Sequence, residues 1–328
     1  FAAAAIGDER PTVTDADVVL GKIDPDGFAG GAIALDRDAA VRAIEKMVAA
    51  PLGENADRAA NAVAEIVEEN MAAAARAHAV ETGESVAART MIAFGGAAPL
   101  HAARLAEKLN IDEIIVPANA GVGSAVGFLL APAAYEVVRS RPMALKTLDA
   151  DTVNALYAEM REEAGAVVRA AVGDAALVAT ATAYARYRGQ GHELATPLTD
   201  FDPRSMASSL QAAFEDAYAR LYGRVLPSAE IEILTWSLAL RAAKPAAAPV
   251  AETPAASAVA SDATRDVYDA GAGDRIAYAL VDRDALFPGA IVNGPALIVE
   301  AQTTCVVTPA YSAQVDGAAN LILTRRNG

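Results

Sequence analysis

Residues 57–130 alternate helical and strand patterns at short spacing, and this alternation restricts the fold more than any other feature. Apolar residues recur at spacings of three and four from Asp57 to Glu81, which predicts one long amphipathic helix. Short apolar runs at residues 89–94 and 113–116 predict buried strands, each followed by a helix. Helices and strands in this order predict an α/β layer with a parallel sheet.

The pattern changes after Pro142. A helical face runs through residues 148–172, and the segment ATATAYARYRG then alternates like a strand. We expect a second helix to begin at Asp202 and Pro203, in the favoured order of a capping residue and a first-turn proline. A long strand at residues 230–242 completes an expected α+β domain.

The last quarter of the chain has a different composition. Alanine, proline and serine dominate residues 242–263, which predicts a linker. Short apolar runs punctuated by Gly and Pro then predict a small β domain. The expected organisation is a connecting segment at 1–56, an α/β lobe at 57–145, an α+β domain at 146–241, the linker at 242–263 and a C-terminal β domain at 264–328.

Composition and charge exclude several classes of partner. The formal charge is −15 and no basic run interrupts it, which argues against nucleic acid or an anionic membrane. No apolar stretch reaches the roughly 18 residues of a membrane-spanning helix. Cys305 is the only cysteine, so it forms no internal disulfide and no cysteine metal site, and we expect a reducing cytoplasm. The chain begins Phe-Ala-Ala-Ala without Met, so we expect it to be part of a longer polypeptide.

Two glycines separate the first predicted strand from the next helix. Gly95 and Gly96 present backbone without a Cβ atom and unpaired N–H groups at the helix start, where a flat ring or a phosphate could lie. A tight structural turn is the alternative reading. His101 lies near the start of the same helix, where a histidine is either catalytic or a packed or capping residue.

The second glycine cluster, GVGSAVG at residues 121–127, does not fit a dinucleotide fingerprint, because three residues separate the last two glycines and no acidic residue follows at the expected distance. No P-loop and no GxSxG serine-hydrolase motif occur in the sequence. Ser124 begins a predicted helix and either helps to hold an anion or acts as an ordinary N-cap.

The segment YARYRGQGHEL concentrates polar groups around a Gly-x-Gly turn. These groups could bind a carboxylate, an amide or a subunit surface, and the alternative is a strand end with its charges in solvent. Neighbouring residues on a strand point to opposite faces, so His192 and Glu193 predict no metal site. The polar residues of this segment are Arg186, Arg188, Gln190, His192 and Glu193.

Taken in order, AFGGAAPLHAARLAEKL, VPANAGVGSAVGFLLAPAAYEVVRSR, RYRGQGHEL and PGAIVNGPALIVEAQTT resemble the C-terminal half of the hydantoinase A/5-oxoprolinase family. TVTDADVVLGKIDPDGFAGGAIALDRDAA resembles the central segment of that family, which includes subunits of acetone and acetophenone carboxylases. The resemblance implies an actin-like ATPase lobe at residues 57–145, an inserted α+β domain and a small C-terminal β domain.

The resemblance also implies site residues. The turn of Gly95, Gly96 and Ala97 would lie against the nucleoside of ATP, with Pro99 and Ser124 as further cofactor-binding residues. The resemblance assigns no catalytic group, and the candidates are His101, Arg188 and His192.

The implied activity is ATP-dependent hydrolysis of a cyclic amide, such as a hydantoin or a 5-oxoproline-like lactam, by phosphorylation of its carbonyl oxygen. A ketone carboxylase subunit and a non-catalytic assembly module are the alternatives. The family's phosphate loops of the form DxGGT do not occur here, so the ligands of the phosphates and of Mg²⁺ are expected outside this chain. We therefore expect a partner, either the N-terminal half of the same polypeptide or a separate subunit, together with a second large subunit of the hydantoinase B type.

Overall fold

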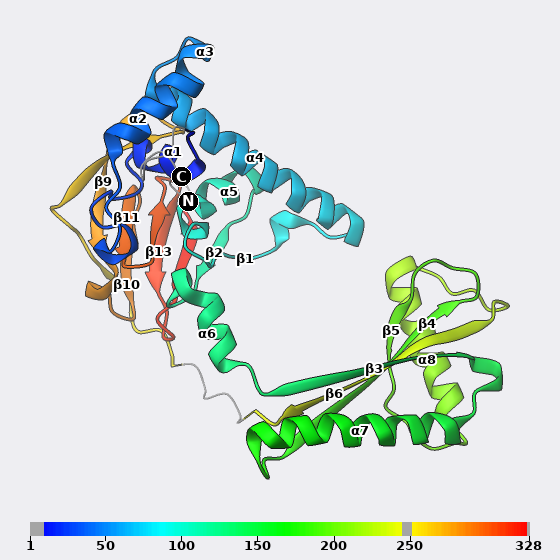
Figure 1. Ribbon diagram of the computed structural model, residues 1–328. Helices are drawn as coiled ribbons and strands as arrows, with labels where there is room; N and C mark the ends of the chain where they lie inside the picture. The colour runs from blue at the N-terminus through cyan, green and yellow to red at the C-terminus, as the bar shows by residue number, and fades with distance from the viewer. Residues whose placement is uncertain (1–9, 245–250, 327–328) are drawn as a thin grey trace. The chain divides into compact units, whose positions relative to one another are not determined.

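The computed structural model describes residues 10–244 and 251–326 of the chain. The chain divides into two compact units, which we call unit 1 and unit 2. Unit 1 contains residues 1–129 and 249–328, and unit 2 contains residues 130–248 (Figure 1). Unit 1 is therefore built from two stretches of sequence that the whole of unit 2 separates.

Helix α1 (Val13–Leu20) opens the described part of unit 1, where the sequence predicted only connecting structure. The Thr12 hydroxyl accepts a hydrogen bond from the N–H of Asp15, and the Asp15 carboxylate accepts one from the N–H of Thr12, so a capping box begins the helix. The other α-helices described in unit 1 are α2 (Arg37–Ile44), α3 (Ala50–Leu52), α4 (Ala56–Thr82), α5 (Ala98–Leu109) and α6 (Gly123–Leu130). Helices α4, α5 and α6 agree with the predicted segments.

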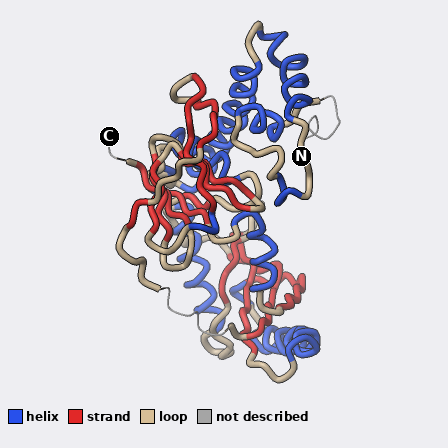
Figure 2. Tube along the Cα trace, turned by 90° about the vertical axis from the view of Figure 1, so that its left-hand side faces the viewer, coloured by secondary structure: helices blue, strands red, loops and turns tan. Residues whose placement is uncertain are grey.

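The strands of unit 1 form two sheets (Figure 2). A six-stranded sheet has the order β1-β2-β14-β13-β10-β7, and a four-stranded sheet has the order β12-β11-β9-β8. The strands are β1 (Met91–Ile92), β2 (Glu113–Val116), β7 (Ser257–Ala258), β8 (Thr264–Asp269), β9 (Asp274–Asp282), β10 (Ala290–Asn293), β11 (Ala296–Glu300), β12 (Thr303–Val307), β13 (Tyr311–Val315) and β14 (Leu321–Arg325).

The two predicted strands of the α/β layer, β1 and β2, are parallel as expected, but the sheet that contains them is mixed. β14 lies antiparallel to β2, with Leu323 opposite Ile114. Residues from both sheets and from α5 share one apolar core, which includes Ala103, Ile298 and Cys305. The C-terminal strands therefore do not form the separate β domain that the sequence predicted, because pairing with β2 makes them part of unit 1.

The predicted linker also differs from the structure. The N–H of Ser257 donates to the carbonyl of Gly289 at 2.9 Å, and the N–H of Val259 donates to Ile291 at 2.8 Å. These bonds make β7 an edge strand parallel to β10, although alanine, proline and serine carry little strand signal. Residues 245–250 of the linker, and the leading residues 1–9, lie outside the described residues.

In its described residues, unit 2 is an antiparallel sheet of order β3-β6-β4-β5 with two α-helices. Its elements are β3 (Ala134–Ala144), α7 (Ala150–Val172), β4 (Leu177–Tyr187), β5 (Leu194–Pro197), α8 (Met206–Tyr222) and β6 (Ile231–Ala242). Tyr157, Phe214 and Trp236 belong to its apolar core. Helix α8 begins at Met206 rather than at Asp202, because the backbone turns before the helix starts.

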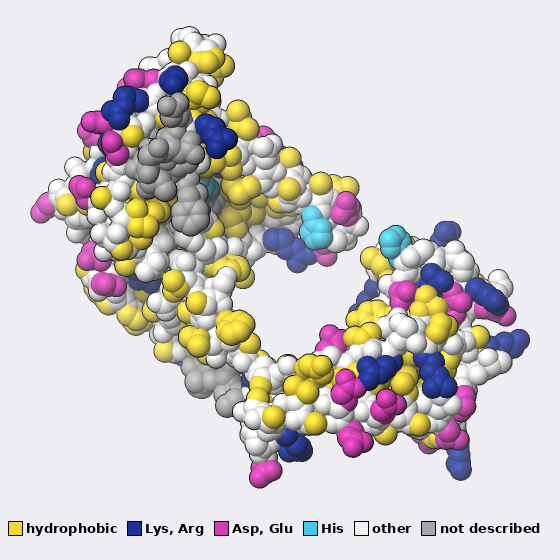
Figure 3. Space-filling model, viewed as in Figure 1, with side chains coloured by type: hydrophobic (Ala, Val, Ile, Leu, Met, Phe, Trp, Pro, Cys, Tyr) yellow, Lys and Arg dark blue, Asp and Glu magenta, His cyan; other side chains and the backbone are white. Residues whose placement is uncertain are grey.

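Charged side chains of both signs lie on the surface (Figure 3). Figure 3 shows acidic and basic groups scattered among apolar ones over the face in view. None of the helices in the described part of the chain combines the length and the apolar character needed to cross a membrane.

Candidate functional site

The Gly95–Ala97 turn links β1 to α5 with an open backbone. The N–H of Gly95 donates to the carbonyl of Ala120 at 2.7 Å, and the φ of Gly95 is +109°, which favours glycine. A Cβ atom at Gly95 would meet no atom within 4 Å. Ala97 caps α5 without a side-chain hydrogen bond, and Pro99 lies buried in its first turn. The start of α5 therefore keeps backbone donors that no capping side chain occupies.

The turn borders a pocket of about 530 Å³, a size suited to a small ligand. Gly96 and Ala97 line it, whereas Gly95, Pro99 and Ser124 do not. The Thr303 hydroxyl donates to the carbonyl of Gly96 at 2.8 Å and joins the turn to β12. The other lining residues are Thr14, Ile23, Asp24, Gly27, Phe28, Ala29, Ile33, Leu100, Gly121, Val299, Glu300, Ala301, Gln302 and Thr304.

The charge of this pocket restricts its ligand. Asp24 and Glu300 are acidic, and no lysine or arginine is among the lining residues. Burial raises the pKa of the Glu300 carboxyl above its usual value. The apolar side chains and the backbone of the turn suit a neutral, flat group such as a nucleoside, whereas a triphosphate would meet no lining cation. The residues present therefore fit the nucleoside part of ATP and not its phosphates.

The second glycine cluster has a packing role. A Cβ at Gly121 would lie 2.4 Å from the Cβ of Gln302 and 2.8 Å from its carbonyl oxygen, so only glycine fits. A Cβ at Gly123 would lie 3.2 Å from the Phe94 ring. Ser124 is exposed at the second position of α6. Close approach to residue 302 thus explains Gly121 and packing against Phe94 explains Gly123 without a ligand, whereas a Cβ at Gly127 would meet nothing within 4 Å.

His101 is buried between two carboxylates. Its Nε2 atom lies 3.2 Å from Asp17 Oδ2 and its Nδ1 atom 3.0 Å from Glu68 Oε1. Burial alone would lower the pKa of the imidazole, but the hydrogen bonds to Asp17 and Glu68 outweigh it and raise the pKa of His101 to about 9. The ring is therefore protonated at neutral pH and donates from both nitrogens. His101 lines neither the pocket at the turn nor the charged pocket described below. Of the two alternatives, a catalytic or a packed residue, its geometry matches the packed one.

Arg188 and His192 belong to unit 2, at the end of β4 and in the loop that follows. Arg188 is exposed and pairs with Glu230 at 2.9 Å. The Gln190 amide donates to the Tyr218 hydroxyl at 2.8 Å, and His192 is exposed. This geometry matches the alternative in which the segment is a strand end with its charges in solvent. A binding role for Arg188 and His192 stays a prediction.

Reasoning from sequence missed several residues of the site. Asp24, Glu300 and Thr303 line the pocket at the turn from segments far away in the chain. They lie in segments that carry the family resemblance, but no local pattern placed them in the site. Among residues 10–244 and 251–326, no group of three or more His, Cys, Asp or Glu side chains is arranged to hold a metal ion.

Comparison with known proteins identifies the family. Residues 1–137 match the family model described as Hydantoinase/oxoprolinase, and residues 142–325 match the model of the Hydantoinase/oxoprolinase C-terminal domain. The chain belongs to the hydantoinase/oxoprolinase family, as its sequence motifs indicated.

Among the curated relatives with named activities are a caprolactamase subunit and an acetone carboxylase subunit. The caprolactamase subunit alpha of Pseudomonas jessenii is 29% identical over 97% of this chain and 47% of its own length. The acetone carboxylase beta subunit of Xanthobacter autotrophicus is 30% identical over 95% of this chain and 45% of its own length. The chain thus spans about half the length of the curated relatives it matches.

Two solved structures share the fold. One is a nucleotide-free structure of acetone carboxylase, described as carrying out ATP-dependent acetone carboxylation. It covers 99% of this chain and 48% of its own chain, with a TM-score of 0.76 at 27% identity. The other is the ATP-dependent caprolactamase from Pseudomonas jessenii, which also covers 99% of this chain and 48% of its own chain, with a TM-score of 0.78 at 28% identity. The mixed α/β architecture with several sheets is therefore common to these proteins.

Proposed function

We propose that this chain supplies the adenosine side of the ATP site in an ATP-dependent enzyme that hydrolyses a cyclic amide. The observation that carries the proposal is the open Gly95–Ala97 turn, whose residues Gly96 and Ala97 line a pocket of about 530 Å³ that contains no cation. In this proposal unit 1 is an actin-like ATPase lobe. Two structural relatives support ATP as the ligand, since both are described as ATP-dependent.

Each part of the turn has a role in the proposed site. The backbone of Gly96 and Ala97 lies against the flat face of the nucleoside, because the missing Cβ at Gly96 leaves room for close approach. Thr303 holds the turn in place through its bond to the Gly96 carbonyl. Asp24 and Glu300 lie at the border of the pocket, where a carboxylate can accept a hydrogen bond from a ribose hydroxyl or an amine.

The chemistry explains why such an enzyme uses ATP. An amide or ketone oxygen is a poor leaving group, and when ATP is bound it supplies the phosphoryl group that improves this oxygen as a leaving group. Such a transfer depends mainly on positioning and on neutralising charge, and Mg²⁺ and cationic or amide-rich loops usually provide both. The pocket at the turn lacks cations, so we assign the phosphate loops and the Mg²⁺ ligands to another part of the enzyme, either the same polypeptide or a partner subunit.

A ketone carboxylase component is the second candidate function. It is favoured by the acetone carboxylase beta subunit, which matches at 30% identity, close to the 29% of the caprolactamase subunit. Both functions use the same activation of a carbonyl oxygen, and they differ in the next step. Water attacks the activated amide carbon in the hydrolase, whereas the enol carbon of the activated ketone attacks a carboxyl donor in the carboxylase. A non-catalytic assembly module is the alternative from another class.

Calorimetric titration of ATP into the complete protein tests the proposal, with Gly96→Val as the variant and Gly127→Val as the matched control. A Cβ at Gly96 would lie 3.5 Å from the carbonyl oxygen of Gln302, an ordinary contact, and a Cβ at Gly127 would meet nothing within 4 Å. Both variants are therefore expected to fold. We expect Gly96→Val alone to weaken ATP binding at least tenfold, since a branched side chain would occupy the nucleoside face.

Equal ATP affinity in a folded Gly96→Val protein would contradict the proposed site. ADP release in the presence of hydantoin, 5-oxoproline or acetophenone then separates the candidates, because the cyclic amides favour the hydrolase and the ketone favours the carboxylase. If none of these substrates stimulates ADP release and ATP does not bind, the assembly module becomes the better account.

A further inference from the structure

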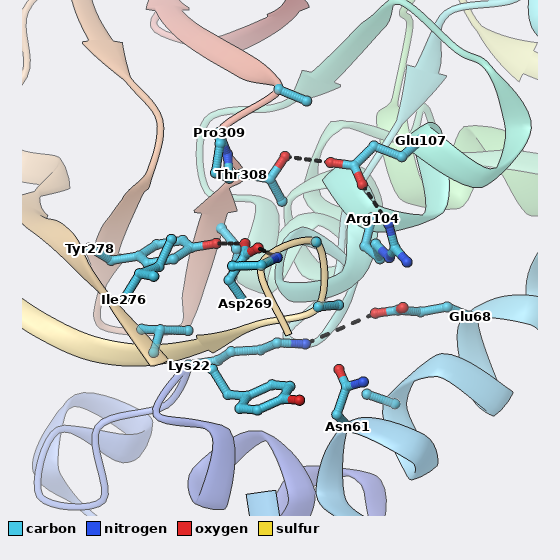
Figure 4. Close-up of a pocket in the computed structure, with 18 of the residues that line it drawn as sticks. Lys22, Asn61, Glu68, Arg104, Glu107, Asp269, Ile276, Tyr278, Thr308 and Pro309 are labelled. Carbon is cyan, nitrogen blue, oxygen red and sulfur yellow. Dashed lines mark hydrogen bonds and ion pairs between the residues drawn. The ribbon is translucent and has the colours of Figure 1, made fainter. Parts of the chain in front are cut away.

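A second pocket of about 550 Å³ lies in unit 1 between α4, α5, the turn that joins β8 to β9 and the chain after β12 (Figure 4). It shares Leu100 with the pocket at the Gly95–Ala97 turn but contains neither Gly96 nor Ala97. We call it the charged pocket, because acidic and basic side chains border it. Those charged residues are Lys22, Glu65, Glu68, Arg104, Glu107, Asp269 and Arg325.

The carboxylates of the charged pocket already have partners. Glu65 accepts from Arg104 at 2.7 Å, and Glu107 accepts from the Thr308 hydroxyl at 2.6 Å. Asp269 accepts from the Tyr278 hydroxyl at 2.7 Å.

Glu68 is bound to protonated His101, whose Nδ1 atom lies 3.0 Å away. Arg104 is occupied as well, since it binds both Glu65 and Glu107. The carboxylates and the Arg104 guanidinium therefore offer little to a ligand.

Lys22 and Asn61 are donors without a short hydrogen bond, as is the Arg325 guanidinium, whose Nη1 atom lies 3.8 Å from Asp112 Oδ1. The Lys22 ammonium lies 3.4 Å from Asp17 Oδ1 and 4.0 Å from Glu68 Oε1, both longer than the roughly 2.7–2.9 Å of a charge-assisted hydrogen bond. Asp17 Oδ1 itself is buried and has no hydrogen-bond partner among the described residues. The Asn61 amide has no hydrogen bond to another described residue, and Figure 4 shows it directed into the pocket near the end of Lys22.

We propose that the charged pocket binds a small organic monocarboxylate, with its carboxylate on Lys22 and Asn61 and its apolar body against Leu100, Val267 and Ile276. One acceptor group matches the donors of Lys22 and Asn61. Four carboxylates and three cations border the pocket, so a ligand with one negative charge is repelled less than a phosphate with its higher charge. The apolar wall suits a short hydrocarbon chain.

The binding site itself does not depend on the proposed function. Its biological occupant does: hydrolysis of a cyclic amide produces a carboxylate that keeps the nitrogen group of the opened ring, and carboxylation of a ketone produces a keto-carboxylate. The reaction product is then the natural ligand, held in unit 1 outside the pocket at the turn.

The test is calorimetric titration of hexanoate, hexanamide and hexylamine into the complete protein, with Asn61→Leu as the variant and Asn70→Leu as its control on the same helix. Asn70 is exposed and does not line the pocket. We expect hexanoate to bind and the other two probes not to bind at the same concentration. Asn61→Leu should weaken hexanoate binding about tenfold, the usual effect of losing one hydrogen bond to a charged group, and Asn70→Leu should leave it unchanged.

Three outcomes would overturn the inference: no binding of hexanoate, equal binding of hexanamide, or equal affinity in Asn61→Leu and the original protein. ATP titration on the same preparations keeps the two proposals distinguishable. Gly96→Val should weaken ATP and not hexanoate, whereas Asn61→Leu should weaken hexanoate and not ATP.

Discussion

The Nδ1 atom of His101 lies 3.0 Å from the Oε1 atom of Glu68 inside unit 1, and its Nε2 atom lies 3.2 Å from Asp17. These three residues come from α5, α4 and α1, so one protonated ring ties three helices together. Lys22 adds a second positive charge beside the two carboxylates. The cluster is electrically balanced only while His101 carries its proton.

Replacing His101 by leucine should therefore destabilise unit 1. The change leaves two buried carboxylates with one cation, and breaking a buried ion pair from one side typically costs about 3–5 kcal/mol. Hydrogen exchange of the amides in α1, α4 and α5 measures the loss locally. His78→Leu is the matched control, because His78 is exposed on α4, and its exchange pattern should stay as it is in the original protein. Unchanged protection in His101→Leu would show that the cluster contributes nothing to stability.

The same cluster predicts a pH dependence. The pKa of His101 is raised to about 9 in the folded protein, above its unfolded value of about 6.5. Its stabilising contribution is therefore complete below about pH 6.5 and is lost as the pH rises through about 9. NMR titration of the histidine ring protons checks this value directly, and a resonance that disappears in His101→Leu should titrate near pH 9. A His101 resonance that titrates below its ordinary value would contradict the ion-paired geometry.

Gly121 should tolerate no side chain. A Cβ there would lie 2.4 Å from Gln302 Cβ and 2.8 Å from Gln302 O, and the latter is backbone. Gly121→Ala should cost about 1–3 kcal/mol of folding free energy through overpacking, and it should also move the segment that borders the pocket at the turn. Urea unfolding measures the cost, with Gly127→Ala as the control at an open position of α6. Equal stability of the two variants would mean that residue 302 can move away freely.

Arg188 provides a test in unit 2. Its ion pair with Glu230 is exposed on both sides, and solvent screens such pairs so that they contribute little to stability. Trp236 is the only tryptophan of the chain and is fully buried in unit 2, so its fluorescence reports unfolding of this unit. Arg188→Gln should leave the urea midpoint of this transition nearly unchanged. A clear fall of the midpoint would mean that Arg188 holds the loop in place, and the reading as a solvated strand end would be wrong.

The sequence predicted the elements with strong periodicity. Helix α4 begins one residue before and ends one residue after the predicted segment, and β2 has the predicted bounds, because apolar spacing reports directly on these elements. Helix α1 was missed because Asp15 and Asp17 interrupt the apolar spacing, although both are buried together with the apolar residues of the helix. Strand β3 was missed because Pro142 interrupts it at a register shift between Ser140 and Met143.

Sequence patterns identified only part of the candidate site. Gly96 follows a strand and precedes a helix, a local pattern that can be recognised in a single sequence. Glu300 and Thr303 lie where β11 and β12 meet in the four-stranded sheet, and Thr303 reaches the turn through its bond to the Gly96 carbonyl, a long-range contact that no local pattern encodes. A different long-range contact, the pairing of β14 with β2, makes the expected β domain part of unit 1.

Photolabelling with an azido derivative of ATP tests the central claim most directly. The complete protein is irradiated with the probe, digested, and the labelled peptides are identified by mass spectrometry. The account predicts labels in the peptides that contain residues 94–100 or 299–304, with competition by unlabelled ATP and loss of the label in Gly96→Val. Competable labelling confined to other segments, unchanged in Gly96→Val, would contradict an adenosine site at the Gly95–Ala97 turn.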